Sequence, residues 1–278
     1  EIQIFANCND PKDIALAINN GAQGIGLVRS EILFMSTVYD LSLASQIRFY
    51  SECINAAKGK EITIRTFDIG ADKPLERLQL EKEPNPALGM RGVRLMYTQK
   101  EIFETQIEAL LVAADRCGKV NVMLPMVTVE SDVTDYFEMV EQVKERLLKE
   151  GKITSDNINW GIMIETPAAA LMSDVLAKYV TFFSIGTNDL TQYTLACDRQ
   201  NPQLESFCDA HHEAVMRLIE FSATNAHKHN KWIGICGELA ADTTLTERFL
   251  RMGIDELSVS PSYVLKLRDT VRKIDLNK

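Results

Sequence analysis

Short apolar runs alternate with helical patterns from one end of the chain to the other. The runs are rich in Ile, Val and Phe and are bounded by Gly, Pro or polar residues, which is typical of parallel strands buried on both faces. They predict strands at residues 2–7, 24–29, 61–68, 119–126, 159–165, 182–188, 232–237 and 256–260. The segments between them carry apolar residues at helical spacing, so the chain reads as a series of strand–helix units.

Capping residues and first-turn prolines mark where several of the helices should begin. The predicted starts are Asp10-Pro11, Thr98 with Glu101 as a capping box, Ser131, Thr166-Pro167, and Asp242 ahead of 245–252. Asn20-Gly21 is expected to end the first of these helices and Gly253 the last.

Strand–helix alternation without a break in composition predicts a single (β/α)8 TIM barrel over residues 1–278. An open, doubly wound parallel sheet is the alternative, but it usually has fewer strands. Two connections, 69–97 and 189–212, are longer than normal and are expected to be functional or disordered. The chain opens directly in a strand-like run, so we expect a domain cut from a longer protein.

Composition and charge exclude some classes of partner. The chain is 46% hydrophobic and 25% charged, as expected of a globular domain. Its net charge of −9 argues against nucleic acid or an anionic membrane as the main partner. No apolar run approaches the roughly 20 residues of a membrane span. Any functional arginine is therefore expected to act locally, inside a cleft.

The cysteines indicate a reducing compartment. The six residues are Cys8, Cys53, Cys117, Cys197, Cys208 and Cys236. They show no CxxC spacing, and the chain has no signal-like start. We therefore expect free thiols and a cytoplasmic location.

Charged and reactive residues gather at the predicted strand ends. They are Asn7, Arg29, Glu31, Arg65, Asp68, Glu165, Asn188, Asp189, Cys236 and Glu238. In a barrel of this kind the active site lies at the carboxyl ends of the strands. Arginines, carboxylates and a thiol at these positions are hard to explain by packing, and they predict a site there.

Glu165 and Asp189 are the candidate metal ligands. Glu165 ends an apolar strand, where a buried carboxylate needs a partner. Mg²⁺ typically takes one or two protein carboxylates and completes its shell with water and substrate oxygens. The alternative is that Glu165 helps to cap the helix at Pro167 and that Asp189 is a turn residue.

Four arginines are candidates for binding an anion. Arg29 and Arg65 each follow an apolar strand, Arg91 lies in the first long connection, and Arg199 comes ten residues after Asp189. A guanidinium group binds carboxylates and phosphates through paired hydrogen bonds. Each arginine taken alone is more often a structural ion-pair partner, and Asp68 is an obvious partner for Arg65. Cation and anion sites side by side nevertheless indicate an enzyme for a small phosphorylated acid.

Cys236 follows a short apolar strand, and Gly237 beside it leaves access to the cleft. It could act as an acid, a base or a nucleophile, whereas most buried cysteines only pack. The four histidines show no zinc-like or triad spacing, and the chain has no P-loop, GxGxxG or GxSxG motif. Nucleotide cradling and serine hydrolysis therefore lack support.

Six motifs in order carry a resemblance to a known family. They are GLVRSE (26–31), RTFDIG (65–70), NPALGMR (85–91), ETPAAA (165–170), GTNDLTQY (186–193) and CGELA (236–240). Together they resemble the phosphoenolpyruvate-utilising enzymes, and specifically the C-terminal domain of enzyme I of the bacterial phosphotransferase system. His212-Glu213 departs from the family's usual His-Pro or Ser-Pro, and Ser30 stands where Thr is common.

The resemblance implies a role for each site residue. Arg29, Arg65 and Arg91 would bind the phosphoryl group of phosphoenolpyruvate, Asn188 and Arg199 its carboxylate, Glu165 and Asp189 would bind Mg²⁺ or Mn²⁺, and Cys236 would protonate C3 of the enolate. These roles agree with the interpretation from charge and spacing.

The resemblance also implies partners. The family's phosphoryl-accepting histidine lies in a separate N-terminal domain, in a motif absent here, and passes the group to a histidine phosphocarrier protein. The family dimerises through this barrel, with Tyr97, Phe103 and Tyr136 as weak candidates for the interface. Two alternatives remain open: the C-terminal domain of pyruvate phosphate dikinase or phosphoenolpyruvate synthase, and a non-catalytic module that senses phosphoenolpyruvate.

Overall fold

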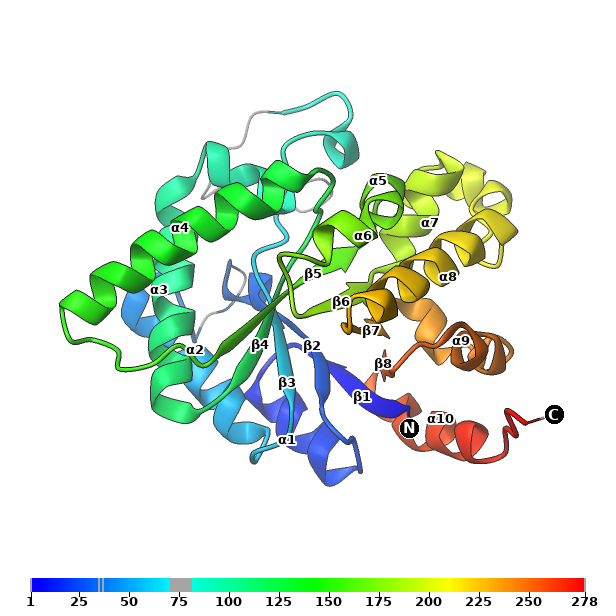
Figure 1. Cartoon of the computed structure of the whole chain (residues 1–278), viewed down its shortest axis with the longest axis horizontal. Coiled ribbons are helices and arrows are strands. Elements are labelled where there is room, and N and C mark those ends of the chain that lie inside the picture. The colour runs from blue at the N-terminus through cyan, green and yellow to red at the C-terminus, as the bar shows by residue number, and fades with distance from the viewer. Residues whose placement is uncertain (1, 35, 37, 71–81, 278) are drawn as a thin grey trace.

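A computed structural model describes residues 2–34, 36, 38–70 and 82–277. Its parallel strands close into a barrel in sequence order, β1 to β8, which confirms the predicted (β/α)8 fold (Figure 1). The strands are β1 Gln3–Cys8, β2 Ile25–Arg29, β3 Ile62–Arg65, β4 Val120–Leu124, β5 Ile158–Ile164, β6 Phe182–Ile185, β7 Trp232–Ile235 and β8 Glu256–Val259. The open-sheet alternative is wrong, because β1 pairs with β8 from Gln3–Glu256 to Ala6–Val259.

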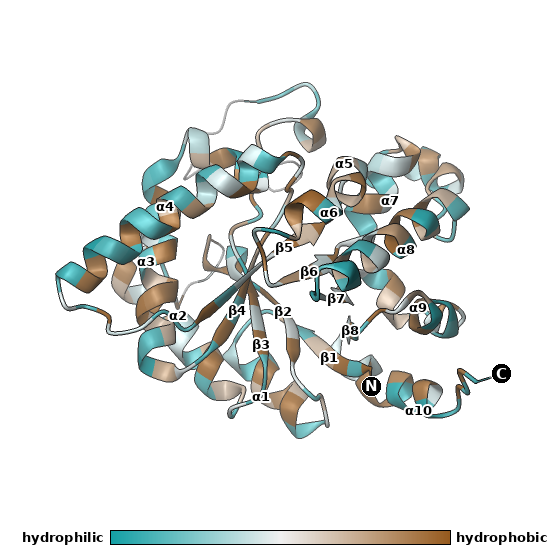
Figure 2. Ribbon diagram, viewed as in Figure 1, coloured by the Kyte–Doolittle hydropathy of each residue, from teal (hydrophilic) through white to brown (hydrophobic). Residues whose placement is uncertain are grey.

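Helices surround the barrel. They are α1 Pro11–Asn19, α2 Leu43–Ala56, α3 Lys100–Cys117, α4 Glu130–Lys149, α5 Pro167–Leu171, α6 Ser173–Leu176, α7 Thr187–Leu195, α8 Glu213–Lys228, α9 Thr246–Met252 and α10 Val264–Arg272. Short 3₁₀ helices add η1 Ser30–Phe34, η3 Pro86–Leu88, η4 Gly92–Tyr97, η5 Pro202–Phe207, η6 Glu238–Ala241 and η7 Pro261–Tyr263. Figure 2 shows long outer helices such as α3 and α4 with both hydrophobic and hydrophilic residues, as expected of helices that cover a core on one side.

Several predicted helix boundaries are confirmed. The Asp10 side chain accepts hydrogen bonds from the backbone N–H groups of Lys12 and Asp13, and Thr166 caps α5 in the same way. Gly253 ends α9 with φ +88°, in the left-handed region that favours glycine. These caps hold because a short polar side chain satisfies first-turn N–H groups that have no helical partner.

Three predicted helix starts are wrong by one or two residues. The cap of α3 is Gln99, and the Thr98 hydroxyl bonds the Leu95 carbonyl instead. Helix α4 begins at Glu130, one residue before Ser131. Asp242 closes a turn onto Thr244, and α9 starts only at Thr246. At Thr98 and at Asp242 a nearby turn competes for the polar group that the pattern assigned to the helix.

Most strands stop one to three residues earlier than their apolar patterns predict, whereas β1 ends at Cys8, one residue later, and β2 ends as predicted at Arg29. The run 182–188 ends as a strand at Ile185, and α7 begins at Thr187, so the predicted long loop from 189 starts inside a helix. Polar residues are favourable in the first turn of a helix, where Asp189 lies. Residues 71–81 of the other long connection lie outside the described residues.

The expectation of six free thiols is wrong for two of them. Cys197 and Cys208 form a disulfide, whereas Cys8, Cys53, Cys117 and Cys236 are free. The sequence pattern did not reveal this pair because the two residues are brought together by a turn after α7. Of the helices within the described ranges, none is long and apolar enough to cross a bilayer.

Candidate active site

A cavity of about 160 Å³ opens at the carboxyl ends of the strands. Its lining includes Arg29, Arg65, Asp68, Glu165, Asn188, Asp189, Arg199 and Cys236. Every residue predicted to bind the substrate or a metal or to act in catalysis is in this set except Arg91, which contacts Asp189 directly. Larger cavities exist, including one of about 490 Å³ lined by residues such as Ile2, His227 and Arg268. Size does not identify the site; the concentration of ionisable groups does.

Arg65, at the end of β3, is held by two carboxylates. It donates to Glu31 and lies 3.2 Å from an oxygen of Asp68, and only 6% of it is exposed. Burial by itself lowers the pKa of Arg65. The negative charges of Glu31 and Asp68 outweigh this effect, so the pKa of Arg65 lies above its ordinary value. The predicted pairing of Arg65 with Asp68 is confirmed. The guanidinium is therefore fixed in place before any ligand arrives.

Arg91 links the anion-binding and cation-binding parts of the site. One of its nitrogens lies 3.2 Å from Asp68 Oδ1 and the other 3.1 Å from Asp189 Oδ1. It also donates to the Tyr193 hydroxyl at 3.1 Å, and that hydroxyl donates to the Ala87 carbonyl. Arginines and carboxylates thus neutralise one another. An anion paired with a cation can replace these contacts without leaving a buried charge unpaired.

Glu165, at the end of β5, is the most deeply buried carboxylate of the site, with 1% exposure. Its Oε1 accepts the backbone N–H of Met126, a residue with φ +60°. Its Oε2 is buried and has no hydrogen-bond partner among the described residues. Burial, together with Asp189 and Asp68, raises the pKa of Glu165 to about 8. A buried oxygen without a partner fits a cation.

The donor set available for a metal is small. The part of the chain that the structure describes holds no cluster of three or more His, Cys, Asp or Glu side chains suited to a metal ion. Two carboxylates are available: Glu165 directly follows β5, and Asp189 lies in the first turn of α7. Such a pair fits Mg²⁺ or Mn²⁺ that takes its remaining ligands from water and a bound anion.

Two glycines allow the ends of β6 and β7 to approach closely. A Cβ on Gly237 would lie 2.0 Å from Thr187 Oγ1, and one on Gly186 would lie 2.7 Å from Glu165 Oε2. A side chain at either position would push the start of α7 away from the strand ends. Glycine there sets the positions of Asn188, Asp189 and Cys236 relative to one another.

Cys236 follows β7 and is 4% exposed. It borders an apolar cluster of Leu27, Met123, Met163 and Phe182 inside the barrel. Its Sγ lies 3.7 Å from the carbonyl oxygen of Ile185, to which the thiol donates. Burial raises the pKa of Cys236 to about 11. The thiol is therefore protonated near neutral pH, which suits a proton donor rather than a thiolate nucleophile.

The remaining groups are more accessible. Arg29 is half-buried and donates to Asn9 Oδ1 at 3.2 Å. The Arg199 side chain is 39% exposed, and its Nη2 lies 3.8 Å from Asp189 Oδ2. Asn188 exchanges two 3.1 Å hydrogen bonds with Glu238, one through each atom of its amide. These side chains are free enough to turn toward an incoming anion.

The sequence analysis assigned no role to Tyr193, Gln192 or Met126. Tyr193 lies on α7 one turn after Asp189, so helical spacing could have placed it beside the carboxylate. Gln192 accepts the backbone N–H of Arg199 at 3.0 Å, and no local pattern reveals a contact of that kind. The positive φ of Met126 likewise has no signal in the sequence.

The fold and the site together define a (β/α)8 barrel with an enzyme-like centre, in which arginines for an anion lie beside carboxylates for a cation. The family model described as "PEP-utilising enzyme, PEP-binding domain" matches residues 1–276. The chain therefore belongs to the PEP-utilising enzymes.

Curated relatives agree with this family. The chain is 43% identical over 276 residues to a phosphoenolpyruvate-protein phosphotransferase of Staphylococcus epidermidis and 39% identical over 274 residues to one of Listeria monocytogenes. Each alignment covers 99% of this chain and 48% of the relative. The chain thus spans about half the length of the curated relatives it matches.

Solved structures support the fold alone. A HpcH/HpaI aldolase from Desulfitobacterium hafniense superposes with a TM-score of 0.53 at 16% identity, covering 100% of this chain and 95% of its own. A HpcH/HpaI aldolase/citrate lyase family protein from Burkholderia cenocepacia gives 0.56 at 12% identity, covering 98% and 93%.

Proposed function

We propose that this chain binds phosphoenolpyruvate with a divalent cation and is the phosphoenolpyruvate-binding half of a phosphoenolpyruvate-protein phosphotransferase. The single observation that supports this most directly is the interlocked set of Arg65, Arg91, Asp68 and Asp189 beside Glu165. Such a set offers positive charge to a phosphoryl group and negative charge to a cation at once. Phosphoenolpyruvate bound to Mg²⁺ presents both.

The arginines divide between the two ends of the ligand. We assign Arg29, Arg65 and Arg91 to the phosphoryl group, because guanidinium groups match its equatorial oxygens and neutralise the charge spread over them during transfer. Arg199 and Asn188 are assigned to the carboxylate, since they line the same cavity from α7 and the turn after it. Preorganised charge of this kind is the main way that enzymes accelerate phosphoryl transfer.

Glu165 and Asp189 would hold Mg²⁺, with Mn²⁺ as an alternative, and the bound ion would add positive charge beside the phosphoryl and enolate oxygens. Arg91 and Cys236 would act on the two parts of the substrate, the phosphoryl group and the enolate. Arg91, which pairs with Asp189 in this structure, would bind the phosphoryl group beside that ion. Cys236 holds its proton at Sγ until the enolate forms, and it then delivers that proton to C3.

Calorimetric titration of the chain with phosphoenolpyruvate tests the binding proposal. With Mg²⁺ present we expect saturable binding, and with chelator the affinity should fall at least about tenfold, because the arginines remain paired with carboxylates. Glu165→Gln should bind weakly in both conditions. Glu145→Gln, an exposed position on α4, is the matched control and should bind as the unmodified chain does. Equal affinity with and without chelator would remove the metal assignment.

The reaction needs a phosphoryl acceptor. We propose that it is a histidine on an N-terminal domain of the longer protein, which passes the group to a histidine phosphocarrier protein. The names of the relatives, together with the 48% of their length that this chain covers, support the proposal. We place the reaction in the cytoplasm, because phosphoenolpyruvate is an intracellular metabolite.

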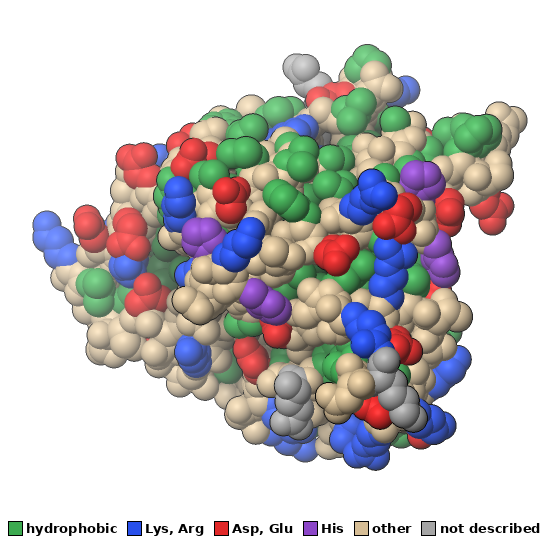
Figure 3. Space-filling model, turned by 45° about the vertical axis from the view of Figure 1, so that its right-hand side comes forward, with side chains coloured by type: hydrophobic (Ala, Val, Ile, Leu, Met, Phe, Trp, Pro, Cys, Tyr) green, Lys and Arg blue, Asp and Glu red, His purple; other side chains and the backbone are tan. Residues whose placement is uncertain are grey.

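A homodimer is the second part of the proposal. Figure 3 shows hydrophobic side chains gathered on one face of the molecule. Leu171, Met172 and Phe221, on adjacent elements α5 to α8, are between 44% and 59% exposed. Phe103 and Tyr136 are 1% and 0% exposed, so their predicted place at an interface is wrong. Exposed apolar residues that lie together mark interaction surfaces more often than residues scattered singly.

Light scattering checks the dimer. At micromolar concentration we expect about twice the chain mass of 31.2 kDa. Leu171→Glu should shift the mass toward that of the single chain, because it places a charge in an apolar contact. Leu265→Glu, at an equally exposed position on α10, should not. A single-chain mass at every concentration for the unmodified protein would contradict the proposal.

A further inference from the structure

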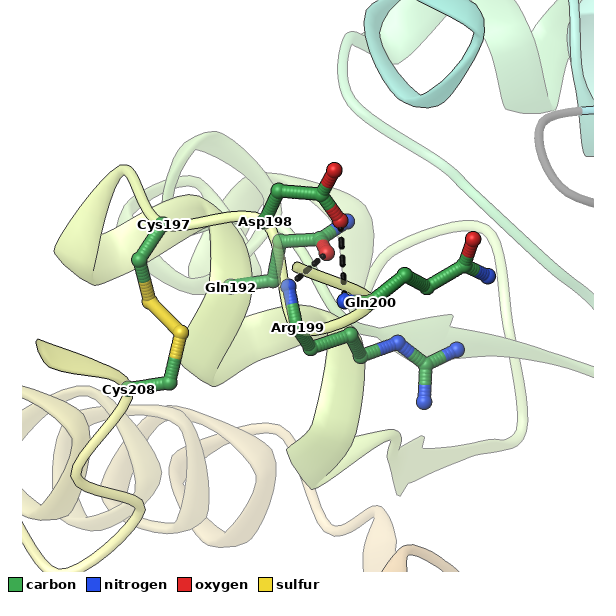
Figure 4. The surroundings of a disulfide bond; sticks show 6 residues. All are labelled: Gln192, Cys197, Asp198, Arg199, Gln200 and Cys208. Atoms are coloured by element: carbon green, nitrogen blue, oxygen red, sulfur yellow. Dashed lines mark hydrogen bonds between the residues drawn. A yellow bond between two sulfur atoms is a disulfide. The ribbon is translucent and has the colours of Figure 1, made fainter. Parts of the chain in front are cut away.

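The disulfide Cys197–Cys208 closes a short loop beside the candidate active site. Its two Cα atoms lie 5.9 Å apart, and the two residues are separated by 11 positions. Cys197 directly follows the left-handed Ala196 that ends α7, and Cys208 follows η5. Figure 4 shows that Arg199 projects from the same loop, close in the chain to the bridge.

The loop is anchored at two places. On one side Gln192 of α7 holds it: its carbonyl accepts the Cys197 N–H at 3.1 Å, and its side-chain oxygen accepts the Arg199 N–H at 3.0 Å (Figure 4). On the other side the bridge ties it to the segment that leads into α8. The backbone of Arg199 therefore depends on the helix that carries Asn188 and Asp189 and on the disulfide.

Arg199 lines more than one cavity. It lines the cavity of about 160 Å³ that holds Glu165 and Cys236, and also a neighbouring one of about 440 Å³. Cys208 lines the second cavity and is half-buried, whereas Cys197 is 4% exposed. A small thiol or disulfide in the larger cavity can therefore reach the bridge through Cys208 without passing Glu165 or Cys236, which line the smaller cavity.

We propose that Cys197 and Cys208 form a reversible oxidation site that sets the affinity for phosphoenolpyruvate by holding Arg199 in place. The inference rests on the proposed function of Arg199 as a ligand of the substrate carboxylate. In the bridged form Arg199 is held ready for the ligand. In the dithiol form its loop samples more conformations, and only a fraction of molecules presents the guanidinium to the cavity.

The exchange is a balanced two-electron reaction with a small-molecule disulfide. The thiolate of Cys208 attacks one sulfur of the disulfide and releases a first small thiol, which leaves a mixed disulfide on Cys208. The thiolate of Cys197 then attacks Cys208 Sγ and releases a second small thiol. The two cysteines are oxidised, the small disulfide is reduced, and the protons of the two cysteine thiols end on the two small thiols.

The magnitude follows from the fraction of competent molecules. When only a part of the population presents Arg199, the apparent dissociation constant rises by the inverse of that fraction, so a fraction of roughly one tenth weakens binding about tenfold. The other four cysteines lie outside this loop and are free thiols. The effect should therefore depend on Cys197 and Cys208 alone.

The test compares the chain treated with oxidised glutathione and the chain treated with dithiothreitol. Peptide mapping confirms the bridge, and titration with Mg²⁺ and phosphoenolpyruvate measures affinity. We expect the bridged chain to bind about tenfold more tightly than the reduced one. The double variant Cys197→Ser, Cys208→Ser should bind like the reduced chain under both treatments. Cys117→Ser, a half-buried free thiol on α3, should respond as the unmodified chain does.

A second readout does not depend on the ligand. Amide hydrogen exchange of residues 198–201 should be slower in the bridged chain, because the loop is anchored at both ends. Equal affinity and equal exchange in the two states would overturn the inference and leave the proposed function intact. No binding in either state would contradict the proposed function, and the exchange rates would still decide whether the bridge holds the loop.

Discussion

Replacing Cys236 by alanine is expected to slow pyruvate formation by about 10²–10⁴-fold, the range for removal of a general acid. Binding of Mg²⁺ and phosphoenolpyruvate should change little, because a neutral thiol forms no ion pair with the ligand. The reason lies in the burial of the side chain, which raises the pKa of Cys236 to about 11 and keeps a proton on Sγ near neutral pH. Among the described residues that line the cavity of about 160 Å³, Cys236 supplies the one thiol.

The assay supplies the histidine domain of a relative in trans and follows pyruvate release. Cys117→Ala is the matched control, since it removes a thiol on α3 without touching the cavity. Phosphoenolpyruvate labelled stereospecifically at C3 adds a second measurement, the stereochemistry of protonation. A cysteine that only packs would not affect it. A fixed thiol protonates one face of the enolate, whereas water protonates both. Unchanged rate and stereochemistry in Cys236→Ala would leave this residue with a packing role only, and the expected loss of stability is then about 1–2 kcal/mol.

The barrel could be predicted because each strand is buried on both faces and therefore carries a near-continuous apolar run. The ends of the strands were less predictable. Phe182–Ile185 and 186–188 form one run in the sequence, yet Gly186 turns the chain and α7 begins at Thr187. The apolar pattern indicates burial, and Thr187, Asp189 and Leu190 in the first turn of α7 are buried like the strand before it.

The members of the candidate site could be predicted because the parallel strands of a barrel bring their carboxyl ends to one rim. The ion pairs between these residues could be predicted only in part. Asp68 was expected to pair with Arg65, and it also pairs with Arg91, which comes from the first long connection. That second contact depends on how the connection folds back over the rim, and no local spacing encodes it.

The disulfide between Cys197 and Cys208 likewise could not be predicted from local spacing. Cys197 and Cys208 are separated by 11 positions, a spacing that on its own favours no pairing. The left-handed Ala196, with φ +51°, turns the chain at the end of α7, and η5 returns it toward the start of α8. The two thiols meet as a consequence of these turns.

Arg91→Met is expected to lower the free energy of unfolding by about 3 kcal/mol, the lower part of the range for removing one partner of a buried ion pair. Arg91 is 5% exposed and contacts Asp68 and Asp189 at 3.2 and 3.1 Å. Methionine has similar length and leaves the two carboxylates buried with less positive charge. Arg65 still pairs with Asp68, and Arg199 lies 3.8 Å from Asp189, which keeps the expected loss from being larger.

Urea unfolding of the variants measures this loss as a shift of the midpoint at constant slope. Arg116→Met, at an exposed position in the last turn of α3, is the control and should change stability by less than about 0.5 kcal/mol. Adding Asp68→Asn to Arg91→Met should recover part of the loss, because it removes a buried carboxylate whose ion pair with Arg91 is already broken. Additive losses in the double variant would show that the two residues are not coupled. The link between the phosphoryl-binding and cation-binding parts of the site would then have to run through Asp189 alone.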